Sequence, residues 1–122
     1  MKSHRLLRAD AARIWSAALR AVEPEAAVRV HVKRQGKRLR ICKHPIRLKE
    51  DARIWVIGAG KAAAPMGLSL ESILGRRLAG GLLVTRYGHG LPLKKLELIE
   101  AGHPLPDSRQ QGRDVRTPLI GN

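Results

Sequence analysis

The spacing of apolar residues predicts an amphipathic helix near the start of the chain. From Leu7 to Val22, apolar residues recur at intervals of three and four, which places them on one face of a helix. Asp10 and Arg13 fall outside that face. Pro24 is expected to end the helix, because proline lacks the N–H that the next helical hydrogen bond needs.

A different pattern follows, in which apolar and polar residues alternate. Apolar residues stand at every second position from Val28 to Val32, and again from Leu39 to Ile41 after the pair Gln35-Gly36. Alternation of period two is typical of a half-exposed strand, and a glycine between two such runs favours a tight turn. The region therefore predicts a β-hairpin with one basic face.

From position 54 onward the pattern becomes that of an α/β fold. Ile54 to Ile57 is a continuous apolar run, as expected for a strand buried on both faces of a parallel sheet. Residues 62–74 have apolar positions at helical spacing, and Gly75 is expected to end that helix. Gly80 to Thr85 and Leu96 to Glu100 predict two further strands. The order predicts a Rossmann-like layered fold with a mostly parallel sheet, although the short second connection leaves the direction of the last strand open.

Charge and composition narrow the classes of function. The chain of 122 residues has 24 Lys and Arg against 10 acidic residues, a net charge of +14, which suits nucleic acid or small anionic substrates. Ten of the basic residues lie between Arg29 and Arg53, where no Phe, Tyr or Trp is interleaved to stack on bases. We therefore favour a solvated basic face over a nucleic-acid stripe.

The single cysteine and the absence of long apolar runs bear on location. Cys42 excludes an internal disulfide, which is typical of a reducing compartment. No apolar run approaches the roughly 20 residues that span a bilayer. We therefore expect a cytoplasmic chain without a membrane partner.

The sharpest motif, Gly58-Ala59-Gly60-Lys61, stands between the first apolar strand and the helix that follows. Its glycines allow a tight turn and a close approach to a ligand. The helix start adds N–H donors and the positive end of a dipole, and Lys61 adds a full charge. Together these features predict an anion or phosphate site.

The motif can be compared with several kinds of anion site. It does not fit a P-loop, because Ala62 stands where Ser or Thr would bind Mg²⁺. It fits a dinucleotide pattern completed by Ala63, with Arg86 placed to contact a 2′-phosphate. It also fits a kinase-type site in which Lys61 neutralises a transferring phosphoryl group or holds a substrate carboxylate. A turn that serves packing alone, with Lys61 at the surface, is the alternative without function.

Two further loops follow the next strands. Thr85 to Gly90 contains Arg86 and His89, which are suited to an anionic substrate, and the other loop runs from Glu100 to Asp107. Ligands bind beyond the carboxyl ends of strands in such sheets, so we expect both loops to lie near Lys61. The histidines and Cys42 show no paired spacing, and no metal-ligating residues are predicted.

Together the three motifs resemble the amino-terminal domain of the glycerate 2-kinase family, whose members were often named hydroxypyruvate reductases. The residues that carry the resemblance are Val56-Ile57-Gly58-Ala59-Gly60-Lys61-Ala62, Thr85-Arg86-Tyr87-Gly88-His89-Gly90 and Glu100-Ala101-Gly102-His103-Pro104-Leu105-Pro106-Asp107. The resemblance covers about Leu6 to Ser108. It implies phosphoryl transfer from ATP to the 2-hydroxyl of D-glycerate, with Mg²⁺. It also implies a catalytic Lys61 in a cleft between two domains.

The remaining expectations concern site residues and extent. The resemblance implies that substrate or phosphate is bound by residues of all three loops, namely Gly58, Gly60, Arg86, Tyr87, Gly88, His89, Gly90, His103 and Asp107.

Family enzymes are much longer than this chain. Residues 1–107 are therefore interpreted as the amino-terminal part of a kinase-like domain, and residues 108–122 as an aberrant, unstructured polar tail. Such a fragment is expected to be inactive alone and to associate through exposed strand edges. An NADP-linked hydroxypyruvate reductase-type domain and a small basic nucleic-acid-binding protein are the alternative functions.

Overall fold

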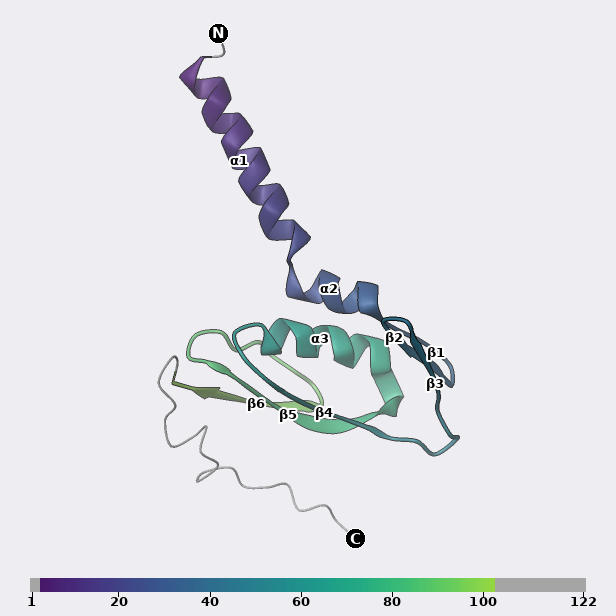
Figure 1. Cartoon of the computed structure of the whole chain (residues 1–122). Coiled ribbons are helices and arrows are strands. Elements are labelled where there is room, and N and C mark those ends of the chain that lie inside the picture. The colour runs from purple at the N-terminus through teal and green to yellow at the C-terminus, as the bar shows by residue number, and fades with distance from the viewer. Residues whose placement is uncertain (1–2, 103–122) are drawn as a thin grey trace.

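The computed structural model describes residues 3–102 (Figure 1). In chain order its elements are α1 (His4–Ala21), α2 (Pro24–His31), β1 (Val32–Gln35), β2 (Arg38–Ile41), β3 (His44–Arg47), β4 (Ile54–Ala59), α3 (Ala63–Leu74), the 3₁₀ turn η1 (Gly75–Arg77), β5 (Leu78–Arg86) and β6 (Leu96–Ala101). The expectations for His103, for Asp107 and for residues 108–122 lie outside the described residues. None of these helices is both long enough and apolar enough to cross a membrane.

The first helix, α1, forms as predicted, but its apolar face is uncovered. It projects away from the rest of the described chain, and none of its residues is buried (Figure 1). Ile14 and Trp15 are 70% and 67% exposed. Pro24 follows the end of α1 and is itself the first residue of α2, a position where its missing N–H costs little. The apolar face of α1 therefore has no partner among residues 3–102.

The alternating residues from Val28 to Val32 were predicted to be a strand, and this prediction is wrong. They lie mostly in α2, where Val28 is buried and the helix packs on α3. Glu25 in the first turn and Arg29 in the last turn complement the helix dipole, and this packing outweighs the β-propensity of valine. The hairpin itself is confirmed, but it begins only at Val32.

The hairpin is part of a three-stranded antiparallel sheet in the order β1-β2-β3. Gly36 has a φ of +58° at the turn between β1 and β2, a conformation that glycine adopts without strain. Leu39 of β2 is buried and joins the hydrophobic core together with residues of α3 and the parallel sheet. The antiparallel sheet is therefore anchored through one face.

A second sheet contains the strands β4, β5 and β6 in that order, and all three are parallel. This arrangement settles the direction of the last strand, which the sequence left open. Residues 87–95 connect β5 to β6 without a helix, so α3 is the helix that covers this sheet (Figure 1). Leu74, Leu78, Leu83 and Leu96 form the core beneath it.

Within residues 3–102 no helix covers the other face of the parallel sheet, and this contradicts the predicted burial of residues 54–57 on both faces. Along β4, every second residue is exposed, and Ile57 is 87% exposed. A strand is buried on both faces only when helices cover both, and one helix layer is present here. The predicted α/β class with a parallel sheet is confirmed, with a three-stranded antiparallel sheet in place of a simple hairpin.

Candidate active site

The carboxyl ends of the three parallel strands meet at one edge of their sheet. Ala59 of β4 pairs with Val84 of β5, and Arg86 of β5 pairs with Ala101 of β6. The N–H of Gly60 donates a hydrogen bond of 2.9 Å to the carbonyl of Val84, which fastens the loop after β4 to the neighbouring strand. The structure thus brings the loop of Gly58 to Lys61 and the loop of Arg86 to Gly90 to the same edge.

The two glycines of the motif Gly58 to Lys61 have different roles, because Gly58 still lies in β4 and Gly60 lies in the loop that follows. Gly60 has a φ of +129°, a backbone conformation that residues with a side chain rarely adopt. A Cβ on Gly58 would stand 3.0 Å from Cδ2 of Leu83, so this position is limited by packing against β5. The loop therefore depends on glycine at both positions.

The start of α3 offers fewer backbone donors than the sequence suggested. The N–H of Ala63 already donates to the carbonyl of Gly60 at 3.1 Å, and Pro65 has no N–H. The side chain of Lys61 is exposed, and within residues 3–102 it makes no hydrogen bond or ion pair. The features that attract an anion here are therefore the helix dipole and the free ammonium group of Lys61.

Thr85 is the polar side chain at this edge that sequence reasoning did not select as a site residue. It is 1% exposed, and its hydroxyl has no hydrogen-bond partner in the described part of the chain. Strand alternation puts it on the same face as Leu83, which lies against α3 at Gly67. A buried hydroxyl without a partner costs about 1–3 kcal/mol and calls for an explanation such as a bound ligand. The only signal in the sequence was a threonine at the end of an apolar strand.

The second loop is held in place by β6. The N–H of Tyr87 donates to the carbonyl of Ala101 at 3.3 Å, and the N–H of His89 donates to the carbonyl of Arg86 at 3.2 Å. The N–H of Gly90 donates to Oε1 of Glu100 at 2.7 Å. Glu100, which the sequence placed in the third motif, therefore positions the second loop.

The remaining residues of that loop differ in how far their side chains are exposed. Arg86, Tyr87 and Gly88 are exposed, and His89 is half-buried. Gly88 has a φ of +76°, which favours glycine at the tip. Arg86 ends the strand that neighbours β4 and is exposed to a ligand, and His89 follows it with a partly exposed side chain.

Glu71 of α3 is a second residue that the sequence did not single out. Its carboxylate accepts hydrogen bonds from the backbone N–H groups of Lys94, Lys95 and Leu96, at 2.6 to 3.0 Å. Partial burial raises the pKa of Glu71, but these donors and the charge of Lys94 lower it by more, so the pKa lies below the usual glutamate value. Glu71 thus clamps the β5–β6 connection to α3.

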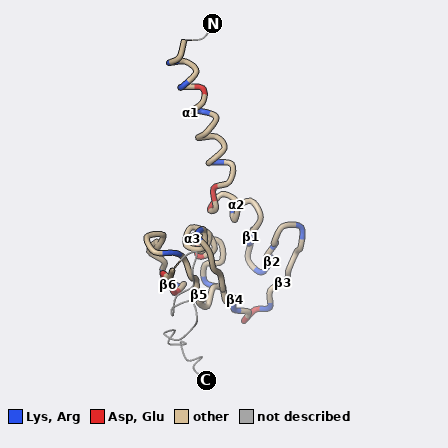
Figure 2. The backbone as a smooth tube through the Cα atoms, turned by 60° about the vertical axis from the view of Figure 1, so that its left-hand side comes forward, with Lys and Arg blue, Asp and Glu red and all other residues tan. Residues whose placement is uncertain are grey.

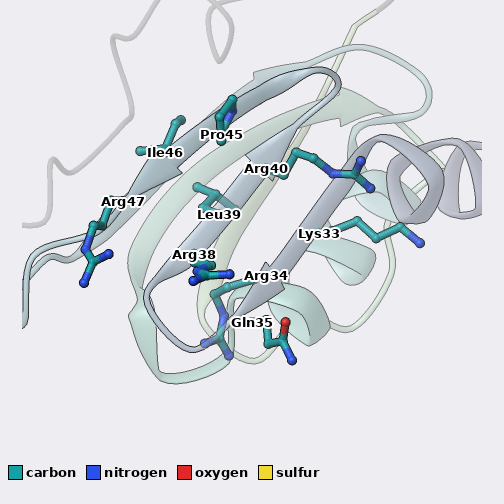
Figure 3. A pocket seen from close by; sticks show the side chains of 9 residues that line it. All are labelled: Lys33, Arg34, Gln35, Arg38, Leu39, Arg40, Pro45, Ile46 and Arg47. Atoms are coloured by element: carbon teal, nitrogen blue, oxygen red, sulfur yellow. The ribbon is translucent and has the colours of Figure 1, made fainter.

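A hollow surface lies on the antiparallel sheet. A groove of about 780 Å³ is lined by the residues labelled in Figure 3, which are Lys33, Arg34, Gln35, Arg38, Leu39, Arg40, Pro45, Ile46 and Arg47. None of them was predicted as a site residue. Among residues 3–102, no group of three or more His, Cys, Asp or Glu side chains is arranged to hold a metal ion.

Comparison with known proteins identifies relatives of the whole region described above. Residues 10–114 match the family described as Domain of unknown function (DUF4147). A glycerate 2-kinase of Pyrococcus horikoshii is 36% identical over 97 residues, which is 80% of this chain and 21% of that protein. A protein of Agrobacterium vitis with the provisional name hydroxypyruvate reductase is 44% identical over 69 residues, which is 57% of this chain and 17% of that protein.

A solved structure agrees with these matches. A crystal structure of a Pyrococcus horikoshii protein superposes with a TM-score of 0.69 at 35% sequence identity, covering 83% of this chain and 22% of that one. The chain thus spans about a fifth of the length of the relatives that it matches. From its sequence and its fold alike, the chain belongs to the glycerate kinase family, of which it represents the amino-terminal region, DUF4147.

Proposed function

We propose that this chain forms one wall of a glycerate 2-kinase active site in which Lys61 is the catalytic cation. The observation that carries the proposal is the meeting of two loops at one sheet edge, joined by the hydrogen bond from Gly60 to Val84. Thr85 adds, at the same edge, a buried hydroxyl that has no hydrogen-bond partner among residues 3–102. Ligands of open α/β sheets bind at such edges.

Each residue has a definite part in this proposal. The ammonium group of Lys61 neutralises negative charge that develops on the transferring phosphoryl group of ATP, or holds the carboxylate of glycerate. The hydroxyl of Thr85 donates a hydrogen bond to an oxygen of the same ligand. Arg86 and His89 bind the anionic substrate from the second loop, whose shape depends on Gly88.

The other parts of the site rest on the family resemblance. Tyr87 and Gly90 line the cleft, and His103 and Asp107 face it from the third loop. Mg²⁺ would accompany ATP, but residues 3–102 do not supply a set of metal ligands, so no step is assigned to the metal through them. Because the chain spans about a fifth of its relatives, we propose that the opposite wall comes from polypeptide outside these residues and that the chain alone has no kinase activity.

An NADP-linked reductase is the second candidate, and one observation favours it. Ala63, the third position of the dinucleotide pattern, is buried at the start of α3, where close packing of helix and strand requires a small residue. Arg86 at the end of β5 would then bind the 2′-phosphate. This candidate uses the same edge of the sheet, so the two are separated by the ligand that binds there.

A titration of the ¹⁵N-labelled chain with ATP and with NADPH tests the proposal. ATP should shift the backbone amide signals of residues 58–61 and 85–90. Lys61→Ala should weaken ATP binding about 10- to 100-fold, as expected for loss of a charged hydrogen bond. Arg76→Ala is the matched control, because Arg76 is an exposed cation next to the start of β5, at the opposite sheet edge.

The outcomes are distinct. Unchanged ATP binding by Lys61→Ala would refute the proposed role of Lys61. Shifts at residues 58–61 with NADPH and none with ATP would favour the reductase. Turnover of ATP and glycerate by the purified chain would show that the fragment is a complete enzyme, contrary to the proposal.

A further inference from the structure

One face of the antiparallel sheet has an unusual composition. In this sheet Lys33 lies opposite Arg40, Arg38 lies opposite both Gln35 and Arg47, and Arg40 also lies opposite Pro45. Residues that are directly paired across antiparallel strands share a face. We call this face the outer basic face, and it consists of Lys33, Gln35, Arg38, Arg40, Pro45 and Arg47. All six residues are exposed.

On the outer basic face, positively charged residues lie directly opposite each other. Lys33 pairs with Arg40, and Arg38 pairs with Arg47, whereas like charges directly opposite across strands destabilise a sheet. The face has no acidic residue to offset this repulsion. Within residues 3–102 none of these four cations makes an ion pair or a side-chain hydrogen bond.

Two neighbouring cations outside this face have partners. Nε of Arg34 donates to the carbonyl of Ile73 at 2.9 Å, and Lys37 forms an ion pair with Glu50. The four cations of the outer basic face have no such partner among residues 3–102. A concentration of unneutralised cations on one face raises the local positive potential, which attracts an anionic ligand.

The outer basic face also borders a groove. All six of its residues line the groove of about 780 Å³, together with Arg34, Leu39 and Ile46 of the other face of the sheet. In this groove Lys33 and Arg40 extend to the same side (Figure 3). A second hollow of about 360 Å³ at the β1–β2 turn shares Gln35, Arg38 and Arg47 with it. Basic residues follow each other along this part of the backbone with few acidic ones (Figure 2).

We propose that the outer basic face binds the phosphate backbone of double-helical nucleic acid, without reading its sequence. Guanidinium groups bind phosphate oxygens through paired hydrogen bonds, and three of the four cations are arginines. No Phe, Tyr or Trp lies in β1, β2 or β3 to stack on the bases of a single strand. The inference is independent of the proposed kinase function.

The same composition argues against an acidic protein as the partner. Protein interfaces have an apolar core from which charged residues are depleted. On the outer basic face, four of six residues are charged, and Pro45 is the one apolar residue. The sequence alone favoured a solvated face, because it did not show that the cations oppose one another across the strands.

Fluorescence anisotropy with a labelled 20-base-pair duplex at 50 and 200 mM salt tests this proposal. The test variant replaces Lys33, Arg38, Arg40 and Arg47 with Gln. The matched control replaces Arg5, Arg8, Arg20 and Arg76 with Gln, which removes the same charge from exposed positions elsewhere. Arginine-to-lysine replacement at 38, 40 and 47 is a third variant, which keeps the charge.

We expect the test variant to reduce the slope of log affinity against log salt by about 3 to 4, since each phosphate contact contributes about 0.9. The control should keep most of the wild-type slope, and the lysine variant should keep its slope as well. Equal losses in test variant and control would show an effect of net charge alone and overturn the proposal. Loss of the slope in the lysine variant would also overturn it.

Competition experiments separate the ligand classes. A duplex should displace the labelled probe at lower phosphate concentration than a single strand of the same length. Poly-glutamate of equal charge should compete more weakly than the duplex. Equal or stronger competition by the single strand or by poly-glutamate would overturn the proposal of a duplex as the ligand.

Discussion

Gly67 of α3 lies directly against Leu83 of β5, so that a Cβ on residue 67 would stand well inside 3.0 Å of a Leu83 methyl carbon. Leu83 is buried in the core of the parallel sheet, which leaves it little room to move. The helix reaches the sheet at this position because it has no side chain there. The contact sets the distance between α3 and β5, and α3 begins at the end of the Lys61 loop.

Gly67→Ala should therefore destabilise the fold. Alanine favours the helix by about 1 kcal/mol relative to glycine, but overpacking a core costs about 1–3 kcal/mol. Because the helix propensity of alanine offsets part of the overpacking, we expect a net loss of up to about 2 kcal/mol in the free energy of unfolding, measured by urea denaturation. Ser72→Ala, at an exposed position of the same helix, is the control and should change it by less than about 0.5 kcal/mol. An unchanged or raised midpoint for Gly67→Ala would contradict the packing argument.

Glu71→Gln should remove the clamp between α3 and the β5–β6 connection. At neutral pH we expect a loss of about 1–3 kcal/mol, because a charged acceptor of three N–H groups is replaced by a neutral one. The folded-state pKa of Glu71 is lowered, so its contribution is present above the unfolded-state pKa and is lost as the pH falls through the folded value. The wild type should therefore lose stability on acidification below about pH 4.5, and the variant should lose less.

Glu97→Gln is the matched control for this measurement. Glu97 is an exposed residue of β6, and its replacement should leave the dependence of the unfolding free energy on pH almost unchanged. If wild type and Glu71→Gln follow the same pH curve, the three backbone hydrogen bonds do not stabilise the fold.

Thr85→Val should separate stability from ligand binding. Valine has the same shape and removes a buried hydroxyl that has no partner among the described residues, so the free energy of unfolding should rise by about 1 kcal/mol. The same change should weaken ATP binding, whereas Thr85→Ser should retain it. Both quantities are measured on the same variants, by urea denaturation and by titration. A valine variant that is less stable and binds ATP normally would show that the hydroxyl serves the fold.

The uncovered apolar face of α1 predicts self-association. Ile14 and Trp15 expose most of their surface, and removal of such surface from water drives association. The charge of +14 opposes it, so oligomers should increase with salt as the repulsion is screened. Replacement of both residues with Gln should shift sedimentation toward monomer, and Ser16→Gln should not. A wild-type chain that sediments as a monomer at every salt and protein concentration would contradict this.

The sequence predicted those features that depend on local pattern. Local signals predicted the apolar stripe of α1, a strand over residues 54–57 and Gly75 at the end of α3. All three are present in the structure, where the strand continues to Ala59. The strand assigned to Val28 was wrong, because packing of α2 on α3 decided its conformation. Alternation over a few residues does not separate a strand from a short helix.

The parts of the site that sequence reasoning missed depend on contacts between distant residues. Glu71 fastens the β5–β6 connection only because the backbone of residues 94–96 passes beside α3 in the fold, and the sequence alone does not show this contact. The pairing of like charges on the outer basic face depends on the strand register. The sequence did not give this register, because it placed the start of the first strand at Val28 and not at Val32. By contrast, the sequence predicted that the Lys61 loop and the Arg86 loop lie at one edge of the sheet, because the carboxyl ends of parallel strands lie at the same edge.

The most direct test of the proposed function is a chimera with a longer relative. In the Pyrococcus horikoshii glycerate 2-kinase, the 97 matched residues are replaced by those of this chain. We predict that the folded chimera phosphorylates glycerate with ATP. We also predict that Lys61→Ala in the chimera lowers kcat at least about 100-fold, as for loss of a charge-stabilising group, while Arg76→Ala does not. A folded chimera without turnover, or one whose kcat is unaffected by Lys61→Ala, would contradict the assignment of this chain as one wall of a glycerate kinase active site.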